Sequence, residues 1–252
     1  MKTVIIGATG LIGSQVKANL EKENQVIAAS PSTGVNTLTG EGLDAALQNA
    51  DVVIDVSNSP SFEDKPVMDF FSTSTGNIIA SAKKAGVKHY IILSVVGTKG
   101  LQGSGYMRAK LVQEDLVKAS GIPFTIVEAT QFFEFASGIV YMSTTSDGKI
   151  VLPKTNIQPI ASADVARFIS ERAVSKPINA TIEIAGPQKW PMHEWISEFA
   201  KRTGHTAEVT SSDDAKYSGA TVTENSLGPN GDFQAGKVSF EDWFAKFTGI
   251  AK

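Results

Sequence analysis

The chain of 252 residues is 42% hydrophobic and 19% charged, values that are ordinary for a globular protein with a large buried core. Its formal net charge of −3 provides no basic footprint for nucleic acid, and its lack of cysteine excludes disulfides, thiolate nucleophiles and cysteine metal sites. Three scattered histidines form no metal-binding pattern and no apolar run could cross a bilayer, so we expect a cytoplasmic protein without a metal ion or membrane contact.

Strand and helix patterns alternate along residues 1–130. The runs predicted as strands are short, apolar and rich in β-branched residues, and they lie at residues 3–7, 25–30, 51–59, 88–96 and 123–130. The runs predicted as helices lie between them, at residues 11–23, 67–85 and 105–119. This alternation with short connections predicts an α/β fold built on a doubly wound parallel sheet.

The pattern loosens after residue 130. An aromatic-rich segment is followed by predicted strands at 148–153 and 180–186 and predicted helices at 162–174, 192–204 and 239–249. Ser162 is the expected N-cap of one helix, and Ser239 with Asp242 has the spacing of a capping box in another. Residues 206–236 are predicted mostly as loop. We therefore divide the chain into a core, residues 1–130, and a small α+β lobe, residues 131–252, from which part of the chain returns to the core sheet.

The first predicted strand ends in GATGLIG, which spaces Gly7, Gly10 and Gly13 three residues apart. Glycine at a strand exit permits a tight turn, and further glycines let backbone N–H groups and the following helix approach a bound diphosphate. The strand–turn–helix context predicts binding of a nicotinamide dinucleotide here.

The type of dinucleotide depends on the end of the second strand. Residues 28–33 read AASPST, with no acidic residue to hold a ribose 2′-hydroxyl and repel a 2′-phosphate. Ser30 and Ser32 can donate hydrogen bonds to a 2′-phosphate, so NADP is the predicted cofactor. NAD stays open, because no arginine is present to bind that phosphate.

Ser94, Tyr106 and Lys110 form a candidate catalytic set. Ser94 lies near the end of a predicted strand, where ligands bind in open α/β sheets, and Tyr106 and Lys110 are one helical turn apart. An ammonium near a phenol lowers its pKa and makes tyrosine a usable acid or base. The alternative interpretation is a half-buried tyrosine followed by a solvated lysine.

Three segments, GATGLIG, YMRAKLVQEDLVKASGIPFTIVEATQFFEF and PIASADVARFI, make the chain resemble the short-chain dehydrogenase/reductase superfamily, in its atypical NmrA-like subgroup. The resemblance implies a Rossmann-type core in which Tyr106 is the acid/base, Ser94 its substrate-side partner and Lys110 a ligand of the nicotinamide ribose. The other implied dinucleotide contacts are Gly7, Thr9, Gly10, Leu11, Ile12 and Gly13 at the diphosphate, Ser57 and Asn58 near the adenosine half, and Thr130, Gln131 and Phe132 beside the nicotinamide. One departure is Glu128, where many such enzymes have an arginine.

The aromatic segment carries Phe132, Phe133 and Phe135, which are interpreted either as the wall of a flat substrate pocket or as core packing between the lobes. The predicted function is an NAD(P)H-dependent oxidoreductase that transfers hydride to a small carbonyl or quinone-like substrate. The alternatives are a non-catalytic redox sensor of the NmrA-like type and a sugar-type epimerase or dehydratase. The substrate and the oligomeric state are left open.

Overall fold

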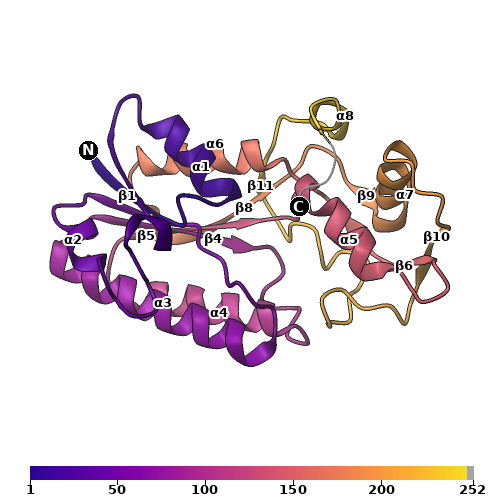
Figure 1. The fold of residues 1–252 in the computed structure, drawn as a ribbon, viewed down its shortest axis with the longest axis horizontal. Coiled ribbons are helices and arrows are strands. Elements are labelled where there is room, and N and C mark those ends of the chain that lie inside the picture. The colour runs from indigo at the N-terminus through magenta and orange to yellow at the C-terminus, as the bar shows by residue number, and fades with distance from the viewer. Residues whose placement is uncertain (249–252) are drawn as a thin grey trace.

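The computed structural model describes residues 1–248 and contains one large parallel sheet (Figure 1). Its strand order is β11-β8-β5-β4-β3-β1-β2, and every neighbouring pair is parallel. In chain order the strands are β1 (Lys2–Ile6), β2 (Gln25–Ala29), β3 (Val52–Asp55), β4 (His89–Val95), β5 (Phe124–Ala129), β8 (Ala180–Ala185) and β11 (Phe233–Ala235). The predicted Rossmann-type, doubly wound sheet is confirmed. No helix within residues 1–248 has the length and apolar character needed to cross a membrane.

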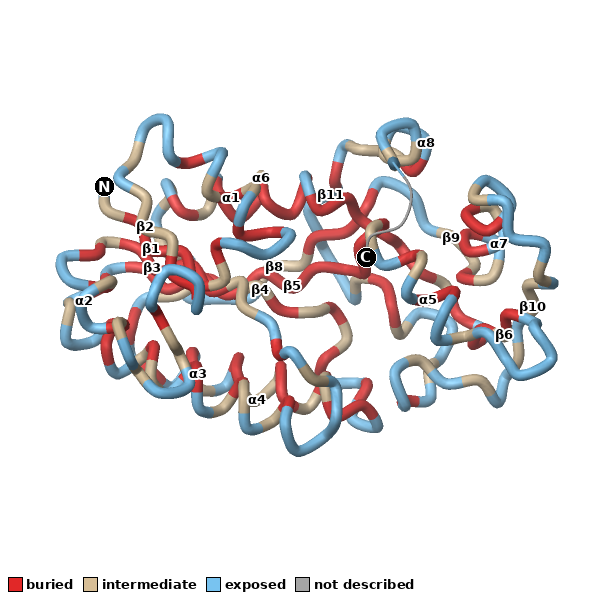
Figure 2. Tube along the Cα trace, viewed as in Figure 1, coloured by how far each residue is buried: buried red, intermediate tan, exposed pale blue. Residues whose placement is uncertain are grey.

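Helices cover both faces of this sheet (Figure 1). One face carries α1 (Leu11–Leu20) and α6 (Ser162–Ala173), and the other carries α3 (Asp64–Ala85) and α4 (Gly105–Ala119), with the short α2 (Leu43–Leu47) at the end near β2. Successive strand residues point to opposite faces, so Val127 packs in the cluster with α6 while Ile126 packs in the cluster with α3 and α4. The buried stretches follow the strands through the middle of the molecule (Figure 2). Both faces are therefore apolar, as a buried parallel sheet requires.

A smaller lobe lies beyond the carboxyl ends of the strands (Figure 1). It contains the parallel pair β6 (Ile150–Pro153) and β10 (Val209–Ser212), the antiparallel pair β7 (Asn156–Ile157) and β9 (Trp190–Pro191), and the helices α5 (Ala136–Ser143), α7 (Met192–Arg202) and α8 (Phe240–Phe244). Its core is aromatic: Phe133, Trp195, Phe199 and Phe240 are each at most 2% exposed. The chain crosses between the lobes repeatedly. After residue 130 it returns to the core to form α6, which covers one face of the large sheet, and the strands β8 and β11 of that sheet.

Several details of the C-terminal half differ from the predictions. Residues 206–236 contain two strands, β10 and β11, and β11 extends the main sheet although its three residues are exposed. The N-cap of α6 is Ala161, and Ser162 is the first helical residue. The Ser162 hydroxyl does not cap the helix but donates a hydrogen bond of 2.6 Å to Glu134. Ser239 is the N-cap of α8, since its Oγ accepts from the Asp242 N–H at 3.1 Å. The capping box is only half formed, because the Asp242 carboxylate accepts from the Ser239 hydroxyl at 2.6 Å. The last helix is shorter than predicted, because α8 ends at Phe244; the predicted end, residue 249, lies outside the described residues.

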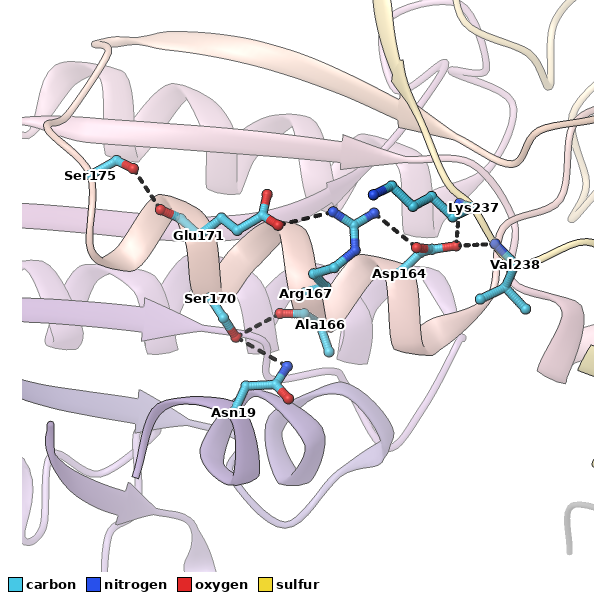
Figure 3. A network of polar contacts seen from close by, with 9 residues as sticks. All are labelled: Asn19, Asp164, Ala166, Arg167, Ser170, Glu171, Ser175, Lys237 and Val238. Atoms are coloured by element: carbon cyan, nitrogen blue, oxygen red, sulfur yellow. Dashed lines mark hydrogen bonds and ion pairs between the residues drawn. The ribbon is translucent and has the colours of Figure 1, made fainter. Parts of the chain in front are cut away.

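Asp164 in the first turn of α6 fixes the returning chain to the core (Figure 3). Its carboxylate is 3% exposed and accepts hydrogen bonds of 2.8 Å from the backbone N–H groups of Lys237 and Val238. Arg167 pairs with the other carboxylate oxygen at 2.9 Å. A side chain at Gly236 would lie 2.8 Å from the same carboxylate, so only glycine permits this close approach. The buried acid thus joins α6 to the segment between β11 and α8.

Candidate functional site

The turn between β1 and α1 is built for close approach. Gly7 has a φ of +81°, and a Cβ there would lie 2.8 Å from the Ser57 backbone nitrogen. A Cβ at Gly13 would lie 2.1 Å from the Gly7 carbonyl oxygen, which is far shorter than a van der Waals contact. Glycine is therefore required at both positions, which the predicted motif anticipated.

The first turn of α1 leaves backbone donors available. Gly10 is the N-cap, no side chain caps this end, and the first turn holds no acidic residue. The first N–H groups of a helix have no partner within the helix, and the helix dipole makes this end attractive to anions. Thr9, Gly10 and Leu11 are exposed, whereas the Ile12 side chain is buried in the core. The cradle of glycines and free donors fits a dinucleotide diphosphate, and Ile12 can contribute only its backbone to it.

The loop after β2 forms a compact hydroxyl cluster. Ser30 is buried, its Oγ lies 2.9 Å from the Ser32 Oγ, and its N–H donates to Thr33 Oγ1 at 2.9 Å. Ser32 and Thr33 are exposed at the surface of the loop. The end of β2 therefore presents hydroxyl donors. Residues 28–33 contribute no carboxylate there.

Ser57 and Asn58 follow β3, next to the glycine turn. The Ser57 hydroxyl donates a hydrogen bond of 2.6 Å to Asp55, and its backbone borders Gly7. Asn58 is exposed. Ser57 therefore shapes the cradle chiefly through its backbone, while Asn58 keeps its side chain available for a ligand.

Tyr106 lies in the first turn of α4, on the carboxyl side of the sheet. Its ring is half-buried, with centroids 5.5 Å from Phe62 and 6.0 Å from Phe71. Lys110 follows one turn later and is buried, 4.5 Å from the centroid of Phe71. Its Nζ donates to the Leu93 carbonyl oxygen at 2.7 Å and also to the side chain of Gln113. The two predicted partners thus share a helix face and an aromatic neighbour, but Lys110 is bonded to other groups.

The structure does not bring Ser94 to Tyr106. The Ser94 hydroxyl donates to the buried carboxylate of Glu114 at 2.6 Å, and that carboxylate also accepts from Lys118 at 3.1 Å. Glu114 lies eight residues beyond Tyr106, which is about 12 Å along a helix at 1.5 Å per residue. Ser94 faces the middle of α4 because of its position in the strand alternation. The predicted role of Ser94 as partner of the tyrosine therefore has no support in this geometry.

The protonation preferences also differ from expectation. Burial, with the neighbouring Tyr217 as a smaller cause, raises the pKa of Tyr106 above its usual value, which is opposite to the lowering predicted from Lys110. Burial lowers the pKa of Lys110 to about 8, against the opposing effect of the Asp55 and Glu114 carboxylates. The resting site therefore holds a neutral phenol, which can donate a proton but is a poor base.

A buried network that the sequence argument did not identify connects the cradle with Lys110. Asp55, at the end of β3, is 1% exposed and accepts from the Tyr90 hydroxyl at 3.3 Å and from Gln113 Nε2 at 3.1 Å. It also accepts from Ser57, and Gln113 accepts from Lys110. The one available signal was the acidic residue that closes the otherwise apolar run VVID.

The segment after β5 carries the polar residues that are predicted to lie beside the nicotinamide. The Thr130 hydroxyl is bonded to the Gln158 carbonyl oxygen at 2.6 Å. Gln131 is 5% exposed, and neither its amide oxygen nor its amide nitrogen has a hydrogen-bond partner within residues 1–248. The Tyr217 hydroxyl is a polar neighbour, but no hydrogen bond of normal geometry joins the two. An unpaired buried amide costs about 1–3 kcal/mol, so Gln131 offers a ready partner to a bound molecule.

The three phenylalanines of the aromatic segment separate into two groups. Phe132 and Phe135 stack with ring centroids 4.9 Å apart, and Phe135 is 48% exposed. Phe133 is 2% exposed and packs against Trp195 and Phe240 in the core of the small lobe. Core packing therefore describes Phe133 and also Phe132, which is buried in the cluster beneath α6, while Phe135 provides an accessible apolar surface.

The chain was compared with known proteins. A family model described as NAD(P)H-binding matches residues 7–176. The photosystem II assembly factor Ycf39 of Cyanophora paradoxa is 27% identical over 231 residues, which cover 83% of this chain and 71% of the relative. The chloroplastic divinyl chlorophyllide a 8-vinyl-reductase of Arabidopsis thaliana is 26% identical over 75% of this chain and 54% of that protein. The dTDP-4-dehydrorhamnose reductase of Bacillus anthracis, solved with NADP, has a TM-score of 0.69 at 14% identity, over 88% of this chain and 86% of that one, which shows a shared fold.

Proposed function

The chain belongs to the NAD(P)H-binding family, and from this premise we propose that it is an NAD(P)H-dependent oxidoreductase that reduces a small carbonyl or quinone-like substrate. The observation that carries the proposal is the neutral, half-buried Tyr106 phenol at the carboxyl side of a sheet whose glycine turn fits a diphosphate. A proton donor beside a dinucleotide cradle is the minimum that a carbonyl reduction requires of the protein.

In this proposal each part of the site has one role. The glycine turn and the first turn of α1 hold the diphosphate, and the Gln131 amide and Thr130 border the reactive end of the dinucleotide. The bound cofactor supplies a hydride. Tyr106 orients the substrate oxygen by a hydrogen bond and gives it a proton. Lys110, one turn away on the same helix face, favours the phenolate that remains, because a nearby ammonium stabilises it.

The proposed substrate class rests on the exposed aromatic rings. Phe135 presents a flat apolar surface that is backed by the buried Phe132, and Phe62 adds an exposed ring beside Tyr106. Flat conjugated carbonyl compounds such as quinones match such a surface through stacking. We therefore place the quinone-like class ahead of small aliphatic aldehydes.

Tyr106→Phe tests the proposed chemistry. We expect kcat for reduction of a quinone by NADPH to fall by about a hundredfold or more, since proton donation by a positioned side chain contributes at least that much. The Kd for NADPH should stay unchanged. The matched control is Tyr141→Phe, which alters a tyrosine that is 84% exposed on α5 and should leave kcat intact. Full turnover in Tyr106→Phe would remove this tyrosine from the mechanism.

The preference for NADP rests on the hydroxyl cluster after β2. Ser32→Asp places a carboxylate there, and we expect the Kd for NADPH to rise about tenfold while the Kd for NADH changes little, because only the former has a 2′-phosphate to repel. Ser32→Asn is the neutral control. Fluorescence titration of the reduced dinucleotides measures both constants. An equal effect on the two dinucleotides would place the ribose elsewhere.

A second candidate function is a non-catalytic redox sensor. Two observations favour it. The first is that Ser94 is bonded to Glu114 and Lys110 to Leu93, so the three residues of the candidate set are not assembled. The second is that the relative from Cyanophora paradoxa is an assembly factor. A sensor must bind oxidised and reduced dinucleotide with different affinities, because equal binding shifts no equilibrium. Isothermal titration with NADP⁺ and NADPH decides this point, and equal Kd values would eliminate the sensor.

A further inference from the structure

A cavity of about 820 Å³ lies on the α4 face of the sheet, away from the glycine turn. Its floor is formed by β5, β8 and β11, and its walls by the loop after β4, residues 97–101, and the segment 223–234. The volume is in the range of pockets that hold small organic molecules. None of the residues that form the glycine cradle lines it.

Strand register explains why a polar floor lies open here. Ser94, Glu128, Glu183 and Phe233 occupy successive positions in one row across β4, β5, β8 and β11, so their side chains point to the same face. Ser94 is covered by α4 through its bond to Glu114. Glu128 is the first member of the row that faces the cavity.

Glu128 is largely buried, and its carboxylate faces the cavity without a partner among residues 1–248. It is 8% exposed, lines the cavity, and has no hydrogen bond or ion pair to any of residues 1–248. The neighbouring acids are engaged: Glu183 accepts from the Asn230 N–H at 2.8 Å, and Glu114 accepts from Ser94 at 2.6 Å. The Glu128 oxygens open onto the cavity and are not enclosed by protein atoms. A ligand that enters the cavity can therefore supply the donor that residues 1–248 do not provide.

The charges of the lining define that donor. Three carboxyl side chains line the cavity, those of Glu128, Glu183 and Asp232, and Lys99 is the single basic residue among them. Leu101 and Phe233 add apolar surface. An acidic floor with apolar walls suits a positively charged group attached to an apolar body.

The electrostatics of Glu128 agree with this picture. Burial raises the pKa of its carboxyl group to about 7, with the charges of Glu114 and Glu183 raising it further and those of Lys99 and Lys118 opposing the rise. A bound cation would favour the ionised form and relieve part of that cost. Cation binding should therefore strengthen as pH rises through 7.

We propose that this cavity is a binding site for a small organic cation, a primary amine with an apolar body whose ammonium group is held by the unpartnered Glu128. The site is separate from the dinucleotide cradle, and the proposal does not depend on the proposed function.

The test uses phenethylamine as the probe and its neutral analogue phenethyl alcohol as the control ligand. Titrations followed by NMR or calorimetry on the intact protein should show saturable amine binding that is at least tenfold weaker in Glu128→Gln. Lys99→Gln should tighten binding two- to threefold, since it removes the competing positive charge. Between pH 6 and pH 8 the affinity should rise about tenfold, following the ionised fraction of a carboxyl group with a pKa of about 7.

The Kd for NADPH should be unchanged in both Glu128→Gln and Lys99→Gln, because neither residue lies at the glycine cradle. This measurement checks that the variants are folded. If Glu128→Gln does not fold, the pH dependence and the comparison of amine with alcohol in the wild-type protein still decide the question. Equal binding of amine and alcohol, binding independent of pH, no binding of the amine, or unaltered binding in Glu128→Gln would each overturn the proposal.

Discussion

Gly13→Ala is expected to abolish measurable binding of NADPH and to lower the free energy of unfolding by about 3 kcal/mol, at the upper end of typical overpacking costs. The added Cβ would lie 2.1 Å from the Gly7 carbonyl oxygen and 2.8 Å from the Ala8 Cα, so the backbone of the turn must move. That movement separates α1 from β1 and displaces the donors that hold the diphosphate. Urea unfolding and fluorescence titration of NADPH measure the two effects.

Gly76→Ala provides the matched control for this prediction. Gly76 lies inside α3, and a Cβ there meets no atom within 4 Å. Alanine is favoured over glycine in helix interiors by about 1 kcal/mol, so this variant should unfold at higher urea and bind NADPH normally. Wild-type NADPH affinity in Gly13→Ala would show that the turn does not form the dinucleotide site.

Asp164→Ala is expected to lower the free energy of unfolding by about 3 kcal/mol, because it removes the buried carboxylate that accepts from two backbone N–H groups and pairs with Arg167. The hydrogen bonds to Lys237 and Val238 attach the C-terminal segment to α6, so the change should also expose this segment (Figure 3). Urea unfolding gives the first effect, and the rate of limited proteolysis within residues 229–239 gives the second.

The control for this variant lies on the same helix. Glu171 pairs with the other side of Arg167 at 3.0 Å, but its side chain is 48% exposed. Exposed ion pairs contribute little, so Glu171→Ala should cost at most about 0.5 kcal/mol and leave proteolysis unchanged. Equal losses in the two variants would show that Asp164 acts only as a surface charge.

Local patterns were sufficient to predict the glycine turn and most of the sheet. Gly7 has a positive φ in the turn itself, the contacts of Gly13 lie within a few residues, and strands such as β4 contain an unbroken apolar run, so adjacent sequence carries the information. β11 was missed because three exposed residues, Phe233–Ala235, carry no such signal and are held by pairing with β8.

The candidate site was predicted less completely, because it depends on which distant residues meet. The sequence places Ser94 near a strand end, but not under Glu114, whose burial on α4 follows from how that helix lies on the sheet. Lys110 has the correct spacing from Tyr106, yet it is bonded to Leu93 because burial makes a nearby carbonyl its best acceptor. Phe132 and Phe133 are adjacent and point to different environments, which composition cannot distinguish.

The edge strand β11 lies late in the chain, so the main sheet is completed late in synthesis. β8 is internal in the finished sheet, but its outer neighbour is synthesised about fifty residues later, after the whole of α7 and β10. Until residues 233–238 leave the ribosome, β8 is an open sheet edge, and the carboxylate of Asp164 lacks its two backbone partners. Unpaired edges invite association between nascent chains. Pairing of β11 with β8 thus closes this edge of the main sheet.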